Sequence, residues 1–119
     1  MANKRILKKQ IKYACGDLAA ECIIAINFVD GIDVKKMQDV VFEIAALQTN
    51  TLKRVSFIYD KVVSDYESKH DYAVARSKYF KQAYTTLRND FDQKVRDIVK
   101  SMNALLPQSQ KDANKRALN

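Results

Sequence analysis

The strongest helical pattern in this chain is the stretch FKQAYTTLRNDFDQKVRDIVKSMNALLP, residues 80–107. Its apolar side chains recur at spacings of three and four residues, which places them along one side of an α-helix. They are Phe80, Tyr84, Leu87, Phe91, Val95, Ile98, Met102 and Leu105. Pro107 ends the pattern, because proline cannot continue a helix. We therefore predict a long amphipathic helix from Asp71 to about Leu106.

The N-terminal part of the chain, from Asn3 to about Asp30, shows the same periodicity. Its apolar stripe consists of Leu7, Ile11, Ala14, Leu18, Cys22, Ala25 and Val29. Further apolar residues (Ile23, Ile24, Ile26 and Phe28) widen the stripe towards its end, so we expect this end to be the more deeply enclosed. A short turn follows, in which Gly31 can take the left-handed conformation that closes a helix and Asp33 can cap the next one.

The second helical segment is expected to run from Val34 to about Ser68. Seven apolar residues of this segment fall on one heptad frame, which also contains the polar residues Gln48 and Thr51. The apolar residues are Val34, Met37, Val41, Ile44, Val55, Ile58 and Val62. Two interpretations remain open: one long helix with a polar layer, or two shorter helices split near Gln48–Thr51. Because no Gly or Pro marks a break, we favour the single helix. Ser68 or Asp71 would cap the third helix.

The scarcity of turn-forming residues supports the same architecture. Only three of the 119 residues are Gly or Pro, too few for the frequent turns of a β-sandwich. We predict an all-α fold: an elongated antiparallel up-down bundle of three long helices, with four helices as the alternative. Residues 1–107 would form one domain, and residues 108–119 a polar, mobile tail. The second and third helices would outreach the first, and a second copy of the chain would cover the excess.

Few residues offer catalytic or metal-binding chemistry. Glu67 and His70 have the Glu-x-x-His spacing of di-metal helical bundles, but those sites need two such motifs and this chain has one histidine. Cys15 and Cys22 fall on the apolar stripe and are expected to be core residues. On one helix they would lie about 10 Å apart, too far to form a disulfide. We therefore expect no cofactor, no metal and no enzymatic activity.

The same residues bear on the expected location of the protein. Free thiols suit a reducing cytoplasm, where we expect the protein to act. No signal peptide and no apolar run of about eighteen residues is recognisable in the sequence. One carboxylate, Glu21, is flanked by Ala19, Ala20 and Cys22, so we treat it as a candidate buried polar residue that would need a partner.

The chain carries a net charge of +7, and the positive charge is concentrated in two places. Residues 1–12 hold five basic side chains and no acidic one. The third helix interleaves basic residues with Tyr72, Tyr79 and Tyr84, a combination that can hold a single nucleic-acid strand by phosphate contact and base stacking. The candidate surface for an anionic partner consists of Lys4, Arg5, Lys8, Lys9, Lys12, Arg76, Lys78, Lys81 and Arg88.

These observations lead to two hypotheses of function. In the first, the protein is a non-enzymatic helical interaction protein that self-associates, most simply as a dimer, through an apolar stripe that the bundle leaves uncovered. In the second, it binds nucleic acid through the basic N-terminus and the Tyr/Lys/Arg face of the third helix. A single continuous basic surface would favour the second hypothesis.

Overall fold

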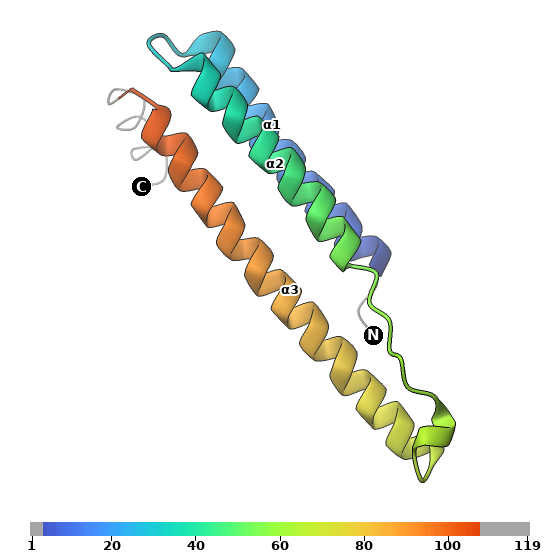
Figure 1. The fold of residues 1–119 in the computed structure, drawn as a ribbon. Helices are drawn as coiled ribbons and strands as arrows, with labels where there is room; N and C mark the ends of the chain where they lie inside the picture. The colour runs from blue at the N-terminus through green and yellow to red at the C-terminus, as the bar shows by residue number, and fades with distance from the viewer. Residues whose placement is uncertain (1–3, 108–119) are drawn as a thin grey trace.

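The computed structural model describes residues 4–107, which form three α-helices. The helices are α1 (Lys4–Phe28), α2 (Val34–Arg54) and α3 (Lys69–Leu105), and a short 3-10 turn, η1 (Val63–Asp65), lies between α2 and α3. The helices run up, down and up beside one another (Figure 1). The molecule measures 65 × 29 × 18 Å, and its radius of gyration is 19.6 Å. A compact domain of this length would have a radius near 13–14 Å. The predicted elongated all-α bundle is confirmed.

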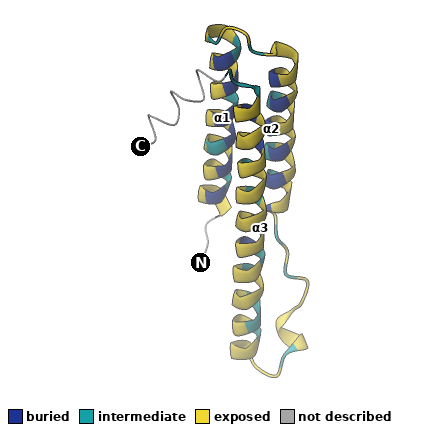
Figure 2. Cartoon of the chain, turned by 90° about the vertical axis from the view of Figure 1, so that its left-hand side faces the viewer, coloured by how far each residue is buried: buried dark blue, intermediate teal, exposed yellow. Residues whose placement is uncertain are grey.

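The core lies where the apolar stripes of the three helices face one another. Figure 2 shows buried residues on α1 and α2, whereas the side of α3 that faces the viewer is mostly exposed. Complete burial of one such side chain contributes about 1.5–3 kcal/mol. The buried cluster is Leu7, Ile11, Cys15, Leu18, Cys22, Ala25, Met37, Val40, Ile44, Leu47, Val55, Tyr84, Leu87, Ile98 and Met102.

The turn between α1 and α2 forms as its sequence predicts. Gly31 has a φ of 79°, a left-handed conformation that residues with a Cβ rarely adopt. The Asp33 carboxylate accepts a hydrogen bond from the backbone N–H of Lys36 at 3.1 Å and so caps α2. These two residues reverse the chain within a few positions and make α1 and α2 antiparallel neighbours.

The second segment differs from both sequence-based interpretations. α2 passes through Gln48–Thr51 without a break and ends at Arg54, well before the expected end at Ser68. The chain then continues as a connector, residues 55–68, without α-helix. Its first residues, VSFIY, are mostly β-branched or aromatic and favour a helix only weakly. Ile58 was predicted on the buried stripe, but its side chain is 77% exposed.

The end of α1 also corrects a prediction. We expected Ile23, Ile24 and Phe28 to be deeply enclosed, but all three are exposed, Phe28 by 80%. In a bundle of three helices, each helix is covered on one side only. The buried side of α1 is taken by Leu18, Cys22 and Ala25, so the residues between them face outward.

α3 is much longer than its neighbours and passes beyond them at one end (Figure 1). Its 37 residues span about 55 Å, whereas the 21 residues of α2 span about 32 Å. We call residues 69–79 of α3 the overhang. The connector runs alongside it in the opposite direction and reaches the start of α3 at its far end (Figure 1). Ser68 caps α3, because its hydroxyl accepts a hydrogen bond from the N–H of Asp71 at 3.1 Å. The expectation that the second helix also outreaches the first is wrong, because α2 ends at Arg54.

Candidate functional site

The first turns of α1 carry two parallel rows of positive charge. Lys4, Lys8 and Lys12 recur every four residues, and Arg5 and Lys9 form the next row. Lys8 is half-buried and the other four are exposed. A shallow hollow of about 510 Å³ lies between the rows and is lined by Arg5, Lys8, Lys9 and Lys12.

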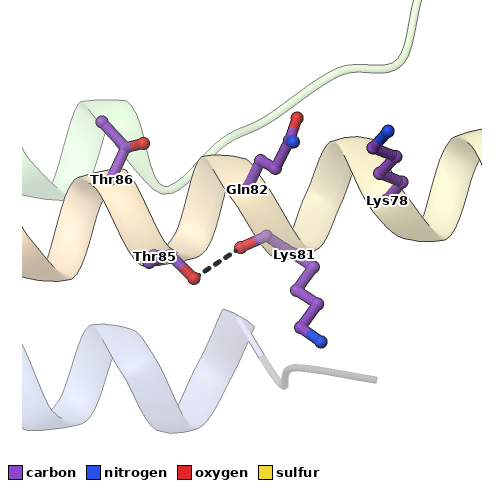
Figure 3. A pocket seen from close by; sticks show the side chains of 5 residues that line it. All are labelled: Lys78, Lys81, Gln82, Thr85 and Thr86. Atoms are coloured by element: carbon purple, nitrogen blue, oxygen red, sulfur yellow. Dashed lines mark hydrogen bonds between the residues drawn. The ribbon is translucent and has the colours of Figure 1, made fainter.

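The middle of α3 carries the second group of basic residues. Arg76, Lys78, Lys81 and Arg88 lie between Asp71 and Asp90, a stretch without acidic residues. Figure 3 shows Lys78, Gln82 and Thr86 along one side of α3, and Lys81 and Thr85 along another. The Thr85 hydroxyl donates a hydrogen bond to the Lys81 carbonyl oxygen at 2.8 Å. The basic side chains of α3 therefore point in more than one direction.

Phe80 is the point at which the two groups of basic residues meet. The Lys4 ammonium lies 5.7 Å from the centre of the Phe80 ring, and the Arg76 guanidinium carbon lies 4.7 Å from it. Lys4 also donates a hydrogen bond to the carbonyl oxygen of Phe57 at 3.0 Å. A hollow of about 410 Å³ opens beside this contact. It is lined by Arg76, Ser77, Phe80, Lys81, Tyr84, Thr85 and Arg88.

α1 and α3 run in the same direction (Figure 1), so residues of the two groups lie at matching levels along the bundle beyond this contact. Both helices rise about 1.5 Å per residue from the level at which Lys4 meets Phe80. Lys8 is therefore level with Tyr84, and Lys12 with Arg88. We call these nine side chains the basic surface: Lys4, Arg5, Lys8, Lys9, Lys12, Arg76, Lys78, Lys81 and Arg88.

Aromatic rings hold the connector against the overhang. The ring of Tyr59 lies 5.9 Å from that of Tyr72 and 5.1 Å from that of Tyr79, and its hydroxyl is hydrogen-bonded to Tyr66. This hydrogen bond raises the pKa of Tyr59 above its ordinary value. Phe57 meets Tyr84 edge-to-face at 4.9 Å. Sequence reasoning missed this cluster because the connector was expected to be helical, which would have carried its rings away from α3.

The basic surface concentrates positive charge without acidic residues in the same stretches of sequence. An ion pair joins Arg54 and Asp90 at 2.9 Å, and neither residue belongs to the surface. The basic residues on α1 repel one another at the i, i+4 spacing, and their charge opposes the helix dipole at its N-terminus. Together these effects cost α1 about 1–2 kcal/mol. Outside the nine residues, the chain holds twelve basic and fourteen acidic side chains.

The structure overturns one candidate residue. Glu21 is exposed on α1, so the expectation of a buried carboxylate is wrong. Its position falls between the buried residues Leu18 and Cys22, on the outer side of the helix. Its charge does reach the core, because it adds to the effect of burial in raising the pKa of the Cys22 thiol.

The remaining candidates lie where sequence reasoning placed them. Cys15 and Cys22 are free thiols in the core, and burial raises the pKa of both. His70 is exposed in the first turn of α3. Across residues 4–107, no group of three or more His, Cys, Asp or Glu side chains is arranged to hold a metal ion.

Comparisons with protein-family models, curated proteins and solved structures gave no match for this chain. Within the described range, no helix has both the length and the apolar character needed to cross a membrane. The tail predicted at residues 108–119 lies outside the described residues.

Proposed function

We propose that this protein is a non-enzymatic helical interaction protein that binds nucleic acid on its basic surface. One observation carries the proposal. The start of α1 and the middle of α3 are far apart in the sequence but meet at Phe80, where Lys4 and Arg76 both lie against the ring. Together the two stretches carry nine positive charges and no negative one. Phosphates would relieve the repulsion between these charges, and their binding would release counterions.

The charge distribution over the rest of the chain supports the same proposal. Residues 13–52 hold six acidic and two basic side chains, so the positive charge is not a general property of the molecule. A net charge that serves solubility alone does not need to be concentrated on one surface. A concentrated positive surface attracts an extended polyanion such as nucleic acid, because every phosphate of its backbone is negatively charged.

The experiment compares two triple variants of equal net charge. In the first, Lys8, Lys9 and Lys12 are replaced by Gln; in the second, Lys35, Lys36 and Lys100 are replaced by Gln, away from the basic surface. Binding of a fluorescent oligonucleotide is measured by anisotropy over a range of salt concentrations. For a single strand, each lost phosphate contact reduces the slope of log K against log salt by about 0.7. We expect the first variant to lose about 2 from this slope and the second to match the wild-type protein.

Three outcomes would overturn the proposal. They are absence of binding to both single- and double-stranded oligonucleotides at low salt, equal losses in the two triple variants, and binding to vesicles of anionic lipid without binding to oligonucleotides. The last outcome would identify the basic surface as a membrane contact instead.

Self-association is a second candidate function, and the overhang supplies the observation that favours it. Several apolar side chains there are exposed on the connector and on α3: Ile58, Val62, Val63 and Val74. A second copy would cover them. Light scattering tests this, because a dimer has twice the mass of the chain. We expect Val74→Asp to be monomeric. The control variant Phe42→Asp, on α2, should remain a dimer. A wild-type protein that stays monomeric at high concentration would rule this function out.

A further inference from the structure

Tyr13 stands apart from every other tyrosine of the chain. Tyr59, Tyr66, Tyr72 and Tyr79 contact one another's rings, and Tyr84 is buried against Phe57. The Tyr13 side chain is 69% exposed, and no aromatic ring of residues 4–107 lies against it. Packing in the core therefore does not account for an aromatic residue at this position.

The position of Tyr13 on α1 relates it to the basic surface. Arg5, Lys9 and Tyr13 are four residues apart, so they lie in one row along the helix. The hollow between this row and the row of Lys8 and Lys12 is lined by basic side chains alone. Tyr13 follows Lys9 by one turn and precedes the first acidic residue of α1, Asp17, by one turn. An exposed ring thus lies one helical turn beyond the basic hollow, in line with Arg5 and Lys9.

We infer that Tyr13 stacks on a base of single-stranded nucleic acid whose phosphates follow the hollow on α1. This inference rests on the proposed function and adds the class of nucleic acid to it. Proteins that hold single strands combine a positive groove with aromatic platforms, because every base has a flat face that can stack. In a duplex the bases are stacked inside, and a ring on the outer side of a helix cannot lie against them.

The chain offers a direct test, because it contains no tryptophan. Tyr13→Trp introduces one fluorophore at the proposed contact. Phe42→Trp is the matched control: Phe42 is 71% exposed, lies on α2 and has no basic residue within one helical turn. On titration with a short oligothymidine, we expect quenching of tryptophan emission in Tyr13→Trp and no change in Phe42→Trp.

A second measurement separates stacking from electrostatic attraction. Tyr13→Ala removes the ring but no charge, so the affinity for the single strand should fall about tenfold while the salt slope stays unchanged. Lys9→Gln should reduce the slope by about 0.7 instead. Tyr13→Phe, which keeps the ring, should retain the wild-type affinity. Circular dichroism confirms that each variant is folded.

The outcomes distinguish this inference from the proposed function. If the wild-type protein binds the oligonucleotide but Tyr13→Trp is not quenched and Tyr13→Ala binds normally, the stacking contact is wrong and the basic surface remains. The single-strand assignment is also overturned if a duplex of the same total charge binds equally well. If the wild-type protein binds neither single strand nor duplex, the proposed function itself fails.

Discussion

The ammonium group of Lys4 lies 5.7 Å from the centre of the Phe80 ring, although the two residues are 76 positions apart in the chain. Arg76 lies 4.7 Å from the same ring centre, and Lys4 also donates a hydrogen bond to Phe57 in the connector. Lys4 thereby joins the start of α1 both to the connector and to the middle of α3. This contact marks the level at which the two basic stretches meet.

Replacing Phe80 should show what these cation–ring contacts contribute to stability. Phe80→Leu keeps an apolar side chain but removes the π-face, so the free energy of unfolding should fall by about 1–2 kcal/mol for two partly exposed contacts. Phe91→Leu is the matched control, since Phe91 is half-buried on the same stripe of α3. Urea denaturation followed by circular dichroism measures both. Equal losses in the two variants would show that the cations contribute nothing.

Replacing the two glycines by alanine should change the stability of the protein in opposite directions. Gly16 lies within α1, and a Cβ built there meets nothing within 4 Å. Gly16→Ala should therefore stabilise the protein by about 0.5–1 kcal/mol. Gly31 has a positive φ, so Gly31→Ala should destabilise it by about 1–2 kcal/mol. Thermal unfolding of both variants checks the signs, and a lower stability of Gly16→Ala would contradict the helical role of that residue.

The overhang should open more readily than the bundle. Residues 69–79 contain no buried side chain, whereas Tyr84, Leu87, Ile98 and Met102 of α3 are buried. Amide hydrogen exchange should therefore be faster over 69–79. Ser68→Ala removes the cap, which is worth about 1 kcal/mol, and should accelerate exchange in this part of α3 alone. Asp33→Ala, which removes the cap of α2, should instead lower the stability of the bundle. Uniform exchange along α3 would argue against an independent overhang.

Stability should decrease at alkaline pH because of the two buried thiols. Burial raises the pKa of Cys15 and Cys22 above the ordinary value of about 8.5. The folded chain then holds the two thiol protons more tightly than the unfolded chain does. The contribution of the protonated thiols to the free energy of unfolding is therefore complete below about pH 8.5 and is lost as the pH rises through the pKa values of the folded state. Urea denaturation at several pH values should show a smaller alkaline loss in the double variant Cys15→Ala/Cys22→Ala. Parallel curves for the two proteins would contradict this.

Sequence periodicity was sufficient to place most of the core. The stripes of α1 and α3 are buried where spacings of three and four predicted, and Gly31, Asp33 and Ser68 form the turn and the caps expected of them. Periodicity failed over the connector, where Val55 is buried while Ile58 is exposed. Apolar residues at helical spacing do not by themselves show where a helix ends when neither Gly nor Pro follows it.

The sequence by itself determined that the fold is helical, where most of the core of α1 and α3 lies, and that nine of its basic residues lie in two stretches free of acidic ones. Tertiary structure alone decided how those stretches relate to each other. They come together because α1 and α3 run in the same direction on α2 and because the connector continues beyond Arg54 along α3, with Phe57 packed on Tyr84 (Figure 1). Local propensity decides only whether and over which residues one segment forms a helix. The contact between Lys4 and Phe80 depends instead on packing between segments that are far apart in the chain.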